Sequence, residues 1–186
     1  MSPLRRTASL ALVSAACLAA APAVASACSG ADLPSVDQAE AQLETTVLCL
    51  INEQRDAAGR SAVRANDKLR AAGLRHSADM VDHSFFAHTS PAGTDFIDRI
   101  MDTGYVRRAR RWVLGENLVW GSGAMSTPSA LVDGWMQSPP HRANLLRKRF
   151  REVGIAAVRG TPFDADNANG ITVSSEYGFR GKRRKR

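Results

Sequence analysis

The sequence predicts an α+β fold, in which several helices pack on a small, mainly antiparallel sheet. Apolar residues recur at helical spacing through the first half of the chain, whereas its last third holds two apolar runs that are typical of strands. A polar stretch with proline and glycines separates these runs and suits a hairpin connection. Helices followed by a meander of strands are typical of α+β domains. The 186 residues suffice for one such domain plus a targeting segment.

Residues 1–27 are predicted to form a secretory signal peptide. Arg5 and Arg6 precede an uncharged apolar run over residues 8–24, and small residues then follow in A-x-A order up to Ala27. The alternative is a retained membrane anchor, but a run of about 17 residues is at the short limit for crossing a bilayer. We therefore expect a protein that is secreted or held in the cell envelope, with no transmembrane segment after cleavage.

The two cysteines beyond the signal, Cys28 and Cys49, are predicted to form a disulfide, because an even pair in an oxidising compartment is typically bridged. The bridge would close about 22 residues and stabilise the fold by roughly 3 kcal/mol. The alternative is lipidation of Cys28, which small residues precede as in a lipoprotein cleavage box. Lipidation would leave Cys49 unpaired, and Ala25 stands where a larger aliphatic residue is preferred.

Two helices are predicted in the first half of the mature chain. Apolar residues over positions 37–58 recur at helical spacing, and Gly59 ends that helix. Asn66 or Asp67 can cap a second helix that runs to about residue 81. His76 lies on the apolar stripe of this second helix, and we interpret it as a core histidine rather than a ligand.

Further elements follow in order along the chain. We expect a third helix capped by Thr94 and ending at Gly104, and a buried strand over residues 112–121. Thr127 followed by Pro128 is a helix-start pattern and predicts a helix that runs to residue 137. Ser138 followed by Pro139 repeats this pattern. After it we expect a short helix over 141–146 and two strands over 150–158 and 171–179, joined by a loop over 159–170. The three tryptophans, Trp112, Trp120 and Trp135, are expected in the core.

The net charge of +7 does not indicate a specific nucleic-acid-binding protein, because the excess lies at the C-terminus. Without the two signal arginines and the five tail residues, the chain has 18 basic and 18 acidic side chains. The tail attracts anionic polymers or lipid headgroups without sequence preference, and a solvated, disordered end is equally compatible. It consists of Lys182, Arg183, Arg184, Lys185 and Arg186. The arginines at 107, 108, 110 and 111 are interpreted as a charged loop.

Three polar residues in apolar or turn contexts are candidates for chemistry. His88 follows a predicted helix in the run F-A-H-T-S-P-A-G, and Glu116 lies inside an apolar strand in G-E-N-L. His141 is in the first turn of a short helix, within W-M-Q-S-P-P-H-R-A-N-L-L. A carboxylate in apolar surroundings must be hydrogen-bonded or paired, so the two histidines are natural partners for Glu116.

These patterns, in this order, resemble the CAP superfamily of cysteine-rich secretory, antigen 5 and pathogenesis-related proteins, in its short bacterial form. The resemblance covers about residues 48–179, and G-E-N-L combined with S-P-P-H-R-x-N-L-L is specific. It implies an α-β-α sandwich forming one domain over residues 28–180, followed by a basic tail at 181–186.

The resemblance also implies a cleft with two histidines and two acids. His88, Glu116 and His141 match three of these groups, but the stretch after Trp135 holds no carboxylate, and Ser138 is the candidate for that place. Two imidazoles and one carboxylate can bind Zn²⁺ or another divalent metal with an open position, and they can equally form a metal-free hydrogen-bond network.

Binding rather than turnover is the leading functional hypothesis, directed at an envelope component, a lipid or a protein partner. One alternative is a metal-dependent hydrolase that uses His88, Glu116 and His141, with Glu116 as a ligand or general base. A second alternative is a cationic envelope-associated or antimicrobial factor acting through residues 182–186. The sequence holds no H-E-x-x-H or G-x-S-x-G motif, which does not favour the enzyme hypotheses.

Overall fold

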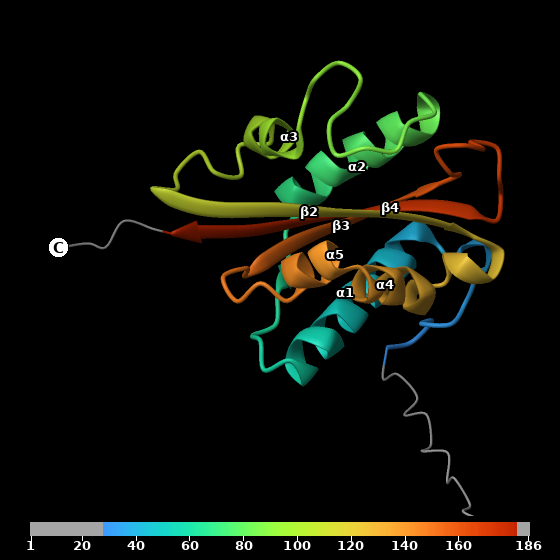
Figure 1. The fold of residues 1–186 in the computed structure, drawn as a ribbon, viewed down its shortest axis with the longest axis horizontal. Helices are drawn as coiled ribbons and strands as arrows, with labels where there is room; N and C mark the ends of the chain where they lie inside the picture. The colour runs from blue at the N-terminus through green and yellow to red at the C-terminus, as the bar shows by residue number, and fades with distance from the viewer. Residues whose placement is uncertain (1–27, 182–186) are drawn as a thin grey trace, which may run out of the picture.

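The computed structural model describes residues 28–181, which fold into a central sheet with helices on both faces (Figure 1). The predicted signal peptide and the basic tail at 182–186 lie outside the described residues. Within residues 28–181, no helix has the length and apolar character needed to cross a membrane.

The sheet has four strands: β1 (Arg64–Ala65), β2 (Arg111–Ser122), β3 (Glu152–Arg159) and β4 (Gly170–Gly181). Their order is β1-β3-β4-β2; β1 pairs parallel to β3, and the other pairs are antiparallel. The mainly antiparallel sheet and the hairpin between β3 and β4 confirm the prediction. The strand β1 was not predicted, because two residues are too few to show an alternating pattern.

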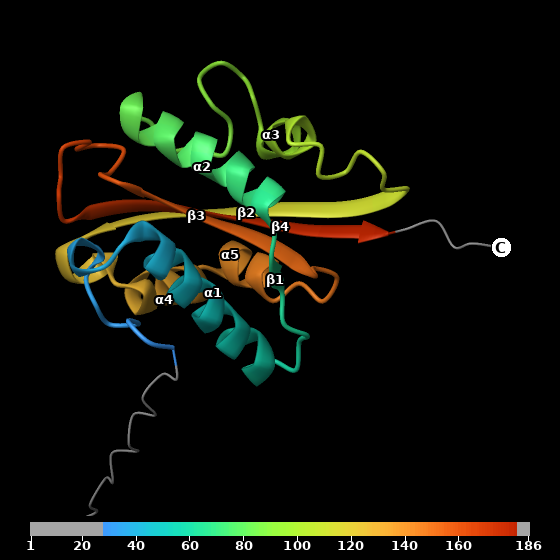
Figure 2. The same cartoon turned by 180° about the vertical axis from the view of Figure 1, so that it is seen from behind.

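The helices cover the sheet in two layers, as the views from opposite sides show (Figure 1 and Figure 2). One layer holds α1 (Glu40–Ala57), α4 (Pro128–Gln137) and α5 (Pro139–Leu145), and the other holds α2 (Asp67–Asp82) and α3 (Phe96–Asp102). Two short 3₁₀ turns, Ser35–Asp37 and Gly123–Ser126, complete the fold. The predicted α+β class and the α-β-α sandwich are thus confirmed.

Apolar side chains pack on both sides of the sheet. The larger cluster joins α1 and α4 to the sheet around Val47, Ile51 and Trp135, and the smaller one joins α2 and α3 to it around Leu69 and Ile100. The core prediction was wrong for two tryptophans: Trp112 and Trp120 are 39% and 41% exposed. Both lie toward the ends of β2, which is an edge strand, so less of the protein covers them.

Two glycines let α2 lie directly against the sheet. A Cβ at Gly154 of β3 would lie 2.0 Å from the backbone nitrogen of Arg70, and a Cβ at Gly73 of α2 would lie 2.4 Å from Ser174 Oγ. No side chain fits in either place. This close approach sets the distance from α2 to the residues of β4 that face it.

Helix capping follows the predictions at two helices and departs from them at a third. The side chains of Asn66 and Thr127 accept backbone N–H bonds at the starts of α2 and α4, as expected. The predicted Thr94 cap of α3 was wrong, because Asp95 caps this helix by accepting from the N–H groups of residues 97 and 98. A carboxylate satisfies the same donors and also complements the helix dipole.

The disulfide between Cys28 and Cys49 is present, with the two Cα atoms 5.8 Å apart. It ties the start of the described chain to α1. The predicted pairing is therefore confirmed, and it is not compatible with lipidation of Cys28.

Candidate functional site

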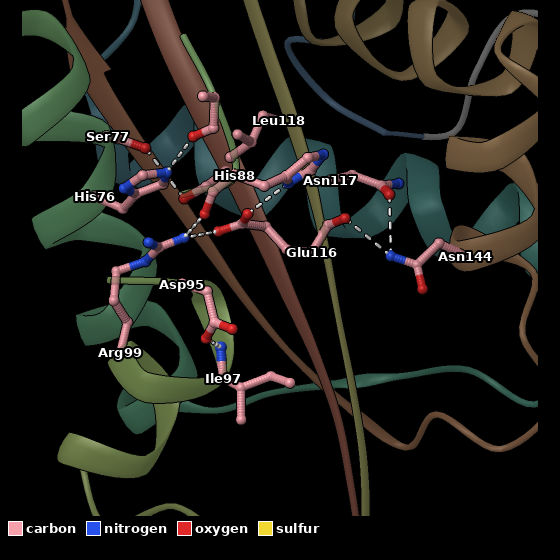
Figure 3. Close-up of polar contacts among 12 residues, drawn as sticks. His76, Ser77, His88, Asp95, Ile97, Arg99, Glu116, Asn117, Leu118 and Asn144 are labelled. Carbon is pink, nitrogen blue, oxygen red and sulfur yellow. Dashed lines mark hydrogen bonds and ion pairs between the residues drawn. The ribbon is translucent and has the colours of Figure 1, made fainter. Parts of the chain in front are cut away.

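Glu116 lies in the middle of β2 with its carboxylate fully buried on the α2–α3 side of the sheet. Its Oε1 accepts a 2.6 Å hydrogen bond from His88 Nδ1, and its Oε2 accepts a 2.7 Å bond from Arg99 Nη2 (Figure 3). Burial acts to raise the pKa of Glu116, but the bonds from His88 and Glu176 and the charge of Arg99 outweigh it and lower the pKa. Glu116 is therefore a buried, paired anion.

Glu176 is the second acid of the site. It is the direct cross-strand partner of Glu116 on β4, and its side chain is fully buried. Neither of its oxygens receives a hydrogen bond from an N–H or O–H group of the described residues. Burial raises its pKa well above the ordinary value, and the negative charge of Glu116 adds to that effect. The protonated form of Glu176 is therefore favoured beside the anion of Glu116.

Alternation along a single strand does not say which face of the sheet is inward, so the sequence alone does not orient Glu176. The register decides its orientation, since directly opposed residues of neighbouring strands point to the same face. Two ionised carboxylates in such a pair would repel each other. A single shared proton removes that repulsion.

Arg99 supplies the positive charge, and the sequence analysis missed it. Its side chain, from α3, is 8% exposed and balances the charge of Glu116. It also donates to the carbonyl oxygens of His88 and Thr94, at 3.0 and 2.9 Å. The sequence feature that could have indicated this role is the position of Arg99 between Ile97 and Ile100 in a short predicted helix. One guanidinium thus holds both the acid and the loop that carries His88.

His76 fixes the same loop from α2. Its ring is buried, as expected for a core histidine, and Nε2 lies 2.8 Å from the carbonyl oxygen of Ala87. Burial lowers the pKa of His76, and the nearby charge of Arg99 lowers it further. The ring is therefore neutral, with its proton on Nε2 donated to that carbonyl. Ala87 and His88 are thus anchored by two buried side chains.

These contacts leave His88 oriented and accessible. Its side chain is 53% exposed although Nδ1 is bonded to Glu116. With Nδ1 bonded to the carboxylate, Nε2 is the ring nitrogen left to meet a ligand. A carboxylate behind an imidazole fixes the orientation of the ring.

The helix α5 brings His141 to the edge of β2. Asn144 Nδ2 donates to the carbonyl oxygen of Glu116 at 3.1 Å and to Asn117 Oδ1 at 3.0 Å. Asn117 Nδ2 donates in turn to the carbonyl oxygen of His141, at 3.1 Å. The Asn144 amide thus provides a hydrogen bond for a backbone carbonyl of β2, which is an edge strand with no further strand beside it within residues 28–181. A Cβ at Gly115 would lie 2.4 Å from Asn144 Oδ1, so only glycine allows this docking.

The G-E-N sequence thus has a role for each residue. Gly115 admits α5, the side chain of Glu116 points to the α2–α3 side, and that of Asn117 points to the α5 side (Figure 3). The opposite directions of Glu116 and Asn117 follow from the alternation of side chains along a strand.

His141 and Ser138 are placed less tightly than His88. The ring of His141 is half-buried, and burial lowers its pKa, as does its electrostatic interaction with His88. Ser138 joins α4 to α5, and its side chain makes no capping hydrogen bond. The acid that accompanies Glu116 is Glu176, not a group near Ser138.

Comparison with known proteins agrees with this geometry. The model of the family described as "CAP: Cysteine-rich secretory protein family" matches residues 48–174. The chain belongs to the CAP family. The site residues from His88 to Asn144 lie within the segment that the family model matches.

A Bacillus subtilis protein is similar to this CAP domain in sequence. It is described as "Uncharacterized protein YkwD" and is 30% identical to this chain. The 115 aligned residues are 62% of this chain and 42% of the relative. The chain thus spans about two fifths of that relative's length.

Solved structures share the fold. An extracellular protein with an SCP domain from Bacillus anthracis superposes with a TM-score of 0.62 at 23% identity, over 78% of this chain and 43% of that one. An outer surface protein of Borrelia burgdorferi gives a TM-score of 0.64 at 18% identity, over 77% and 97% of the two chains. A Staphylococcus aureus cysteine-rich secretory protein gives a TM-score of 0.54 at 16% identity, over 75% of this chain and 39% of that one.

His88, Glu116 and His141 of this CAP domain do not form a compact three-ligand metal centre. Within residues 28–181, the one group of three such side chains with ligand atoms mutually within 4.8 Å is Cys28, Cys49 and Glu53, and its two sulfurs form the disulfide. Both oxygens of Glu116 are also occupied by His88 and Arg99. Metal binding through the two imidazoles stays a prediction.

Proposed function

We propose that this CAP domain acts by binding a ligand and not by hydrolysing a substrate. The occupancy of Glu116 is the observation that carries the proposal. A general base must have a free lone pair within reach of water. The carboxylate of Glu116 is fully buried and accepts hydrogen bonds from His88 and Arg99, and burial raises the pKa of Glu176 well above its ordinary value. Neither acid is available to activate water.

The part of the site that faces outward is imidazole. His88 presents its Nε2 atom to the outside, and His141 lies on the helix α5, half-buried. Both rings can accept hydrogen bonds or bind a transition metal when neutral. The buried groups behind His88 hold it in one orientation before a ligand arrives, which reduces the entropy lost on binding.

We place the protein outside the cytoplasm, in the envelope or beyond it. The predicted signal peptide and the disulfide support this placement, since disulfides persist in oxidising compartments. The structural relatives are described as an extracellular protein and an outer surface protein. The ligand would then be an envelope component, a lipid or a protein partner.

The joint action of the two imidazoles is tested with Zn²⁺ as a probe. Zn²⁺ is titrated into the full chain while the ring signals of each histidine are followed by NMR, in the wild type and in His88→Ala, His141→Ala and His83→Ala. His83 is an exposed histidine at the end of α2, so His83→Ala is the matched control.

A shared site predicts that Zn²⁺ moves the His88 and His141 signals together. Either substitution should then weaken binding at least tenfold, whereas His83→Ala leaves it unchanged. Independent shifts of the two rings, or equal affinities in all four proteins, would contradict a shared imidazole site.

A further inference from the structure

A hollow lies at the end of the sheet where β4 finishes, five residues beyond Glu176. Its volume is about 530 Å³, within the range of small-ligand pockets. The start of β2 and the C-terminal end of β4 meet there, beside the loop that follows α3 (Figure 1). Its lining includes Arg64, Tyr105, Arg108, Arg151, Phe179 and Arg180.

Basic side chains dominate this hollow. Four arginines face one acid, Glu152, which is already neutralised by Arg180 at 2.7 Å. Glu152 also accepts bonds from Tyr105 Oη and Asn66 Nδ2. Three positive charges, on Arg64, Arg108 and Arg151, are left without an acidic partner in the lining.

Two of these cations are free to bind a ligand. Arg64 and Arg108 are exposed, and their side chains form no hydrogen bond or ion pair with other residues in the range 28–181. They come from separate elements, β1 and the loop before β2. Arg151 is held in place by its bonds to the carbonyl oxygens of Lys148 and Phe150.

The base of the hollow is rigid. The guanidinium of Arg180 lies 4.3 Å from the centre of the Tyr105 ring, and Tyr105 is buried under Gly178. A fixed base with arginines on its rim is pre-organised for a ligand with several acceptor oxygens. A phosphodiester group carries two anionic and two ester oxygens in a tetrahedral arrangement, so guanidinium groups from separate elements can bind it from different sides, whereas a carboxylate offers two oxygens in one plane.

We propose that this hollow binds a phosphate group of a phosphodiester-linked anionic polymer of the cell envelope. The loop over residues 107–111, expected from the sequence to be only a charged loop, contributes Arg108 to the site. Five further cations follow Gly181 directly in the sequence. The inference is independent of the imidazole site.

The proposal is tested by the binding of a fluorescently labelled linear polyphosphate to the full chain. The test variant is Arg64→Gln/Arg108→Gln. The control, Arg107→Gln/Arg110→Gln, removes the same charge from exposed arginines outside the lining. A chain lacking residues 182–186 separates the hollow from the tail, and thermal unfolding checks that all variants fold.

The test variant should bind at least roughly tenfold more weakly, since charge-assisted bonds to phosphate are lost. The control should change affinity less than about twofold. The same difference should persist without the tail. Inorganic phosphate should compete for the site better than acetate at equal ionic strength.

Three results would overturn the proposal. Equal weakening in both double variants would indicate general electrostatic attraction, and binding that vanishes only with the tail would assign it to residues 182–186. A test variant that loses binding to phosphatidylglycerol vesicles, but not to polyphosphate, would assign the hollow to a lipid surface.

Discussion

At the residue scale, one buried ion pair and one buried acid lie behind the imidazole site. Glu116 and Arg99 are buried with opposite charges, and burial raises the pKa of Glu176 well above its ordinary value. Removing one partner of a buried pair leaves an uncompensated charge, which costs far more than an exposed pair contributes.

Arg99→Met is therefore expected to destabilise the fold by about 3–5 kcal/mol, because it keeps the side-chain volume but strands the charge of Glu116. Urea unfolding gives the free energy of unfolding. The exposed Arg107→Met is the control and should stay within about 0.5 kcal/mol of the wild type. Equal stabilities for the two variants would contradict the buried pair.

Glu176→Gln should flatten the dependence of stability on pH. The folded-state pKa of Glu176 is raised, so its contribution is fully present below the ordinary pKa of 4.5 and is lost as pH rises through the folded-state pKa. Glutamine does not titrate and can still donate an N–H to Glu116. Thermal unfolding between about pH 5 and 8 should show a smaller decline for the variant than for the wild type. Parallel curves would show that Glu176 is not protonated by folding.

The sequence predicted the outer part of this site better than its inner part. His88, Glu116 and His141 stand in local patterns that a reader of the sequence can find. Arg99 becomes functional only because α3 docks its side chain against β2, and Glu176 only because the register places it opposite Glu116. The docking of α3 and the register between β2 and β4 depend on contacts between distant parts of the chain, so no local sequence pattern predicts them.

At the element scale, the approach of α2 to the sheet positions the groups that hold the His88 loop. Gly154 and Gly73 are the contact points, and His76 lies one turn further along α2 than Gly73. The spacing of these layers therefore depends on two missing side chains.

Gly154→Ala should destabilise the protein by several kcal/mol, because its Cβ would lie 2.0 Å from the backbone of α2. Gly134→Ala is the matched control: nothing lies within 4 Å of its Cβ, and alanine favours the helix α4 by about 0.5–1 kcal/mol. Chemical unfolding should thus show opposite signs for the same substitution. Similar effects at both positions would contradict the close approach.

Element boundaries were predictable where capping or alternation is strong. Asn66 and Thr127 mark the starts of α2 and α4 in the sequence as they do in the structure. Thr94 was the wrong choice beside Asp95, since both residues can cap and their order alone does not select one.

At the scale of the whole molecule, the sandwich carries separate surfaces around one sheet. The imidazole site lies at the edge formed by β2, and the arginine-lined hollow lies at the end where β4 finishes. The overall class followed from the order of helices and strands, but the arginine-lined hollow did not, because it joins residues from β1, β3, β4 and a loop.

The disulfide secures the first residues of this molecule. Cys28→Ser/Cys49→Ser should lower the free energy of unfolding by about 3 kcal/mol, the value for closing a loop of this length. Adding a reductant should destabilise the wild type by a similar amount and leave the double variant unchanged. Mass spectrometry of the exported protein supplies the complementary check, since a lipid on Cys28 would contradict the bridge.

The protonation of the two acids tests the account most directly. Carbon-13 NMR of the chain labelled at the glutamate carboxyl carbon, with Glu176→Gln to assign the signal, measures each acid at neutral pH. The account predicts that one buried glutamate, Glu176, is protonated at pH 7 and that Glu116 stays ionised below its ordinary pKa. A Glu116 signal that titrates near pH 7, or a Glu176 that is ionised there, would contradict the closed network and reopen Glu116 as a general base.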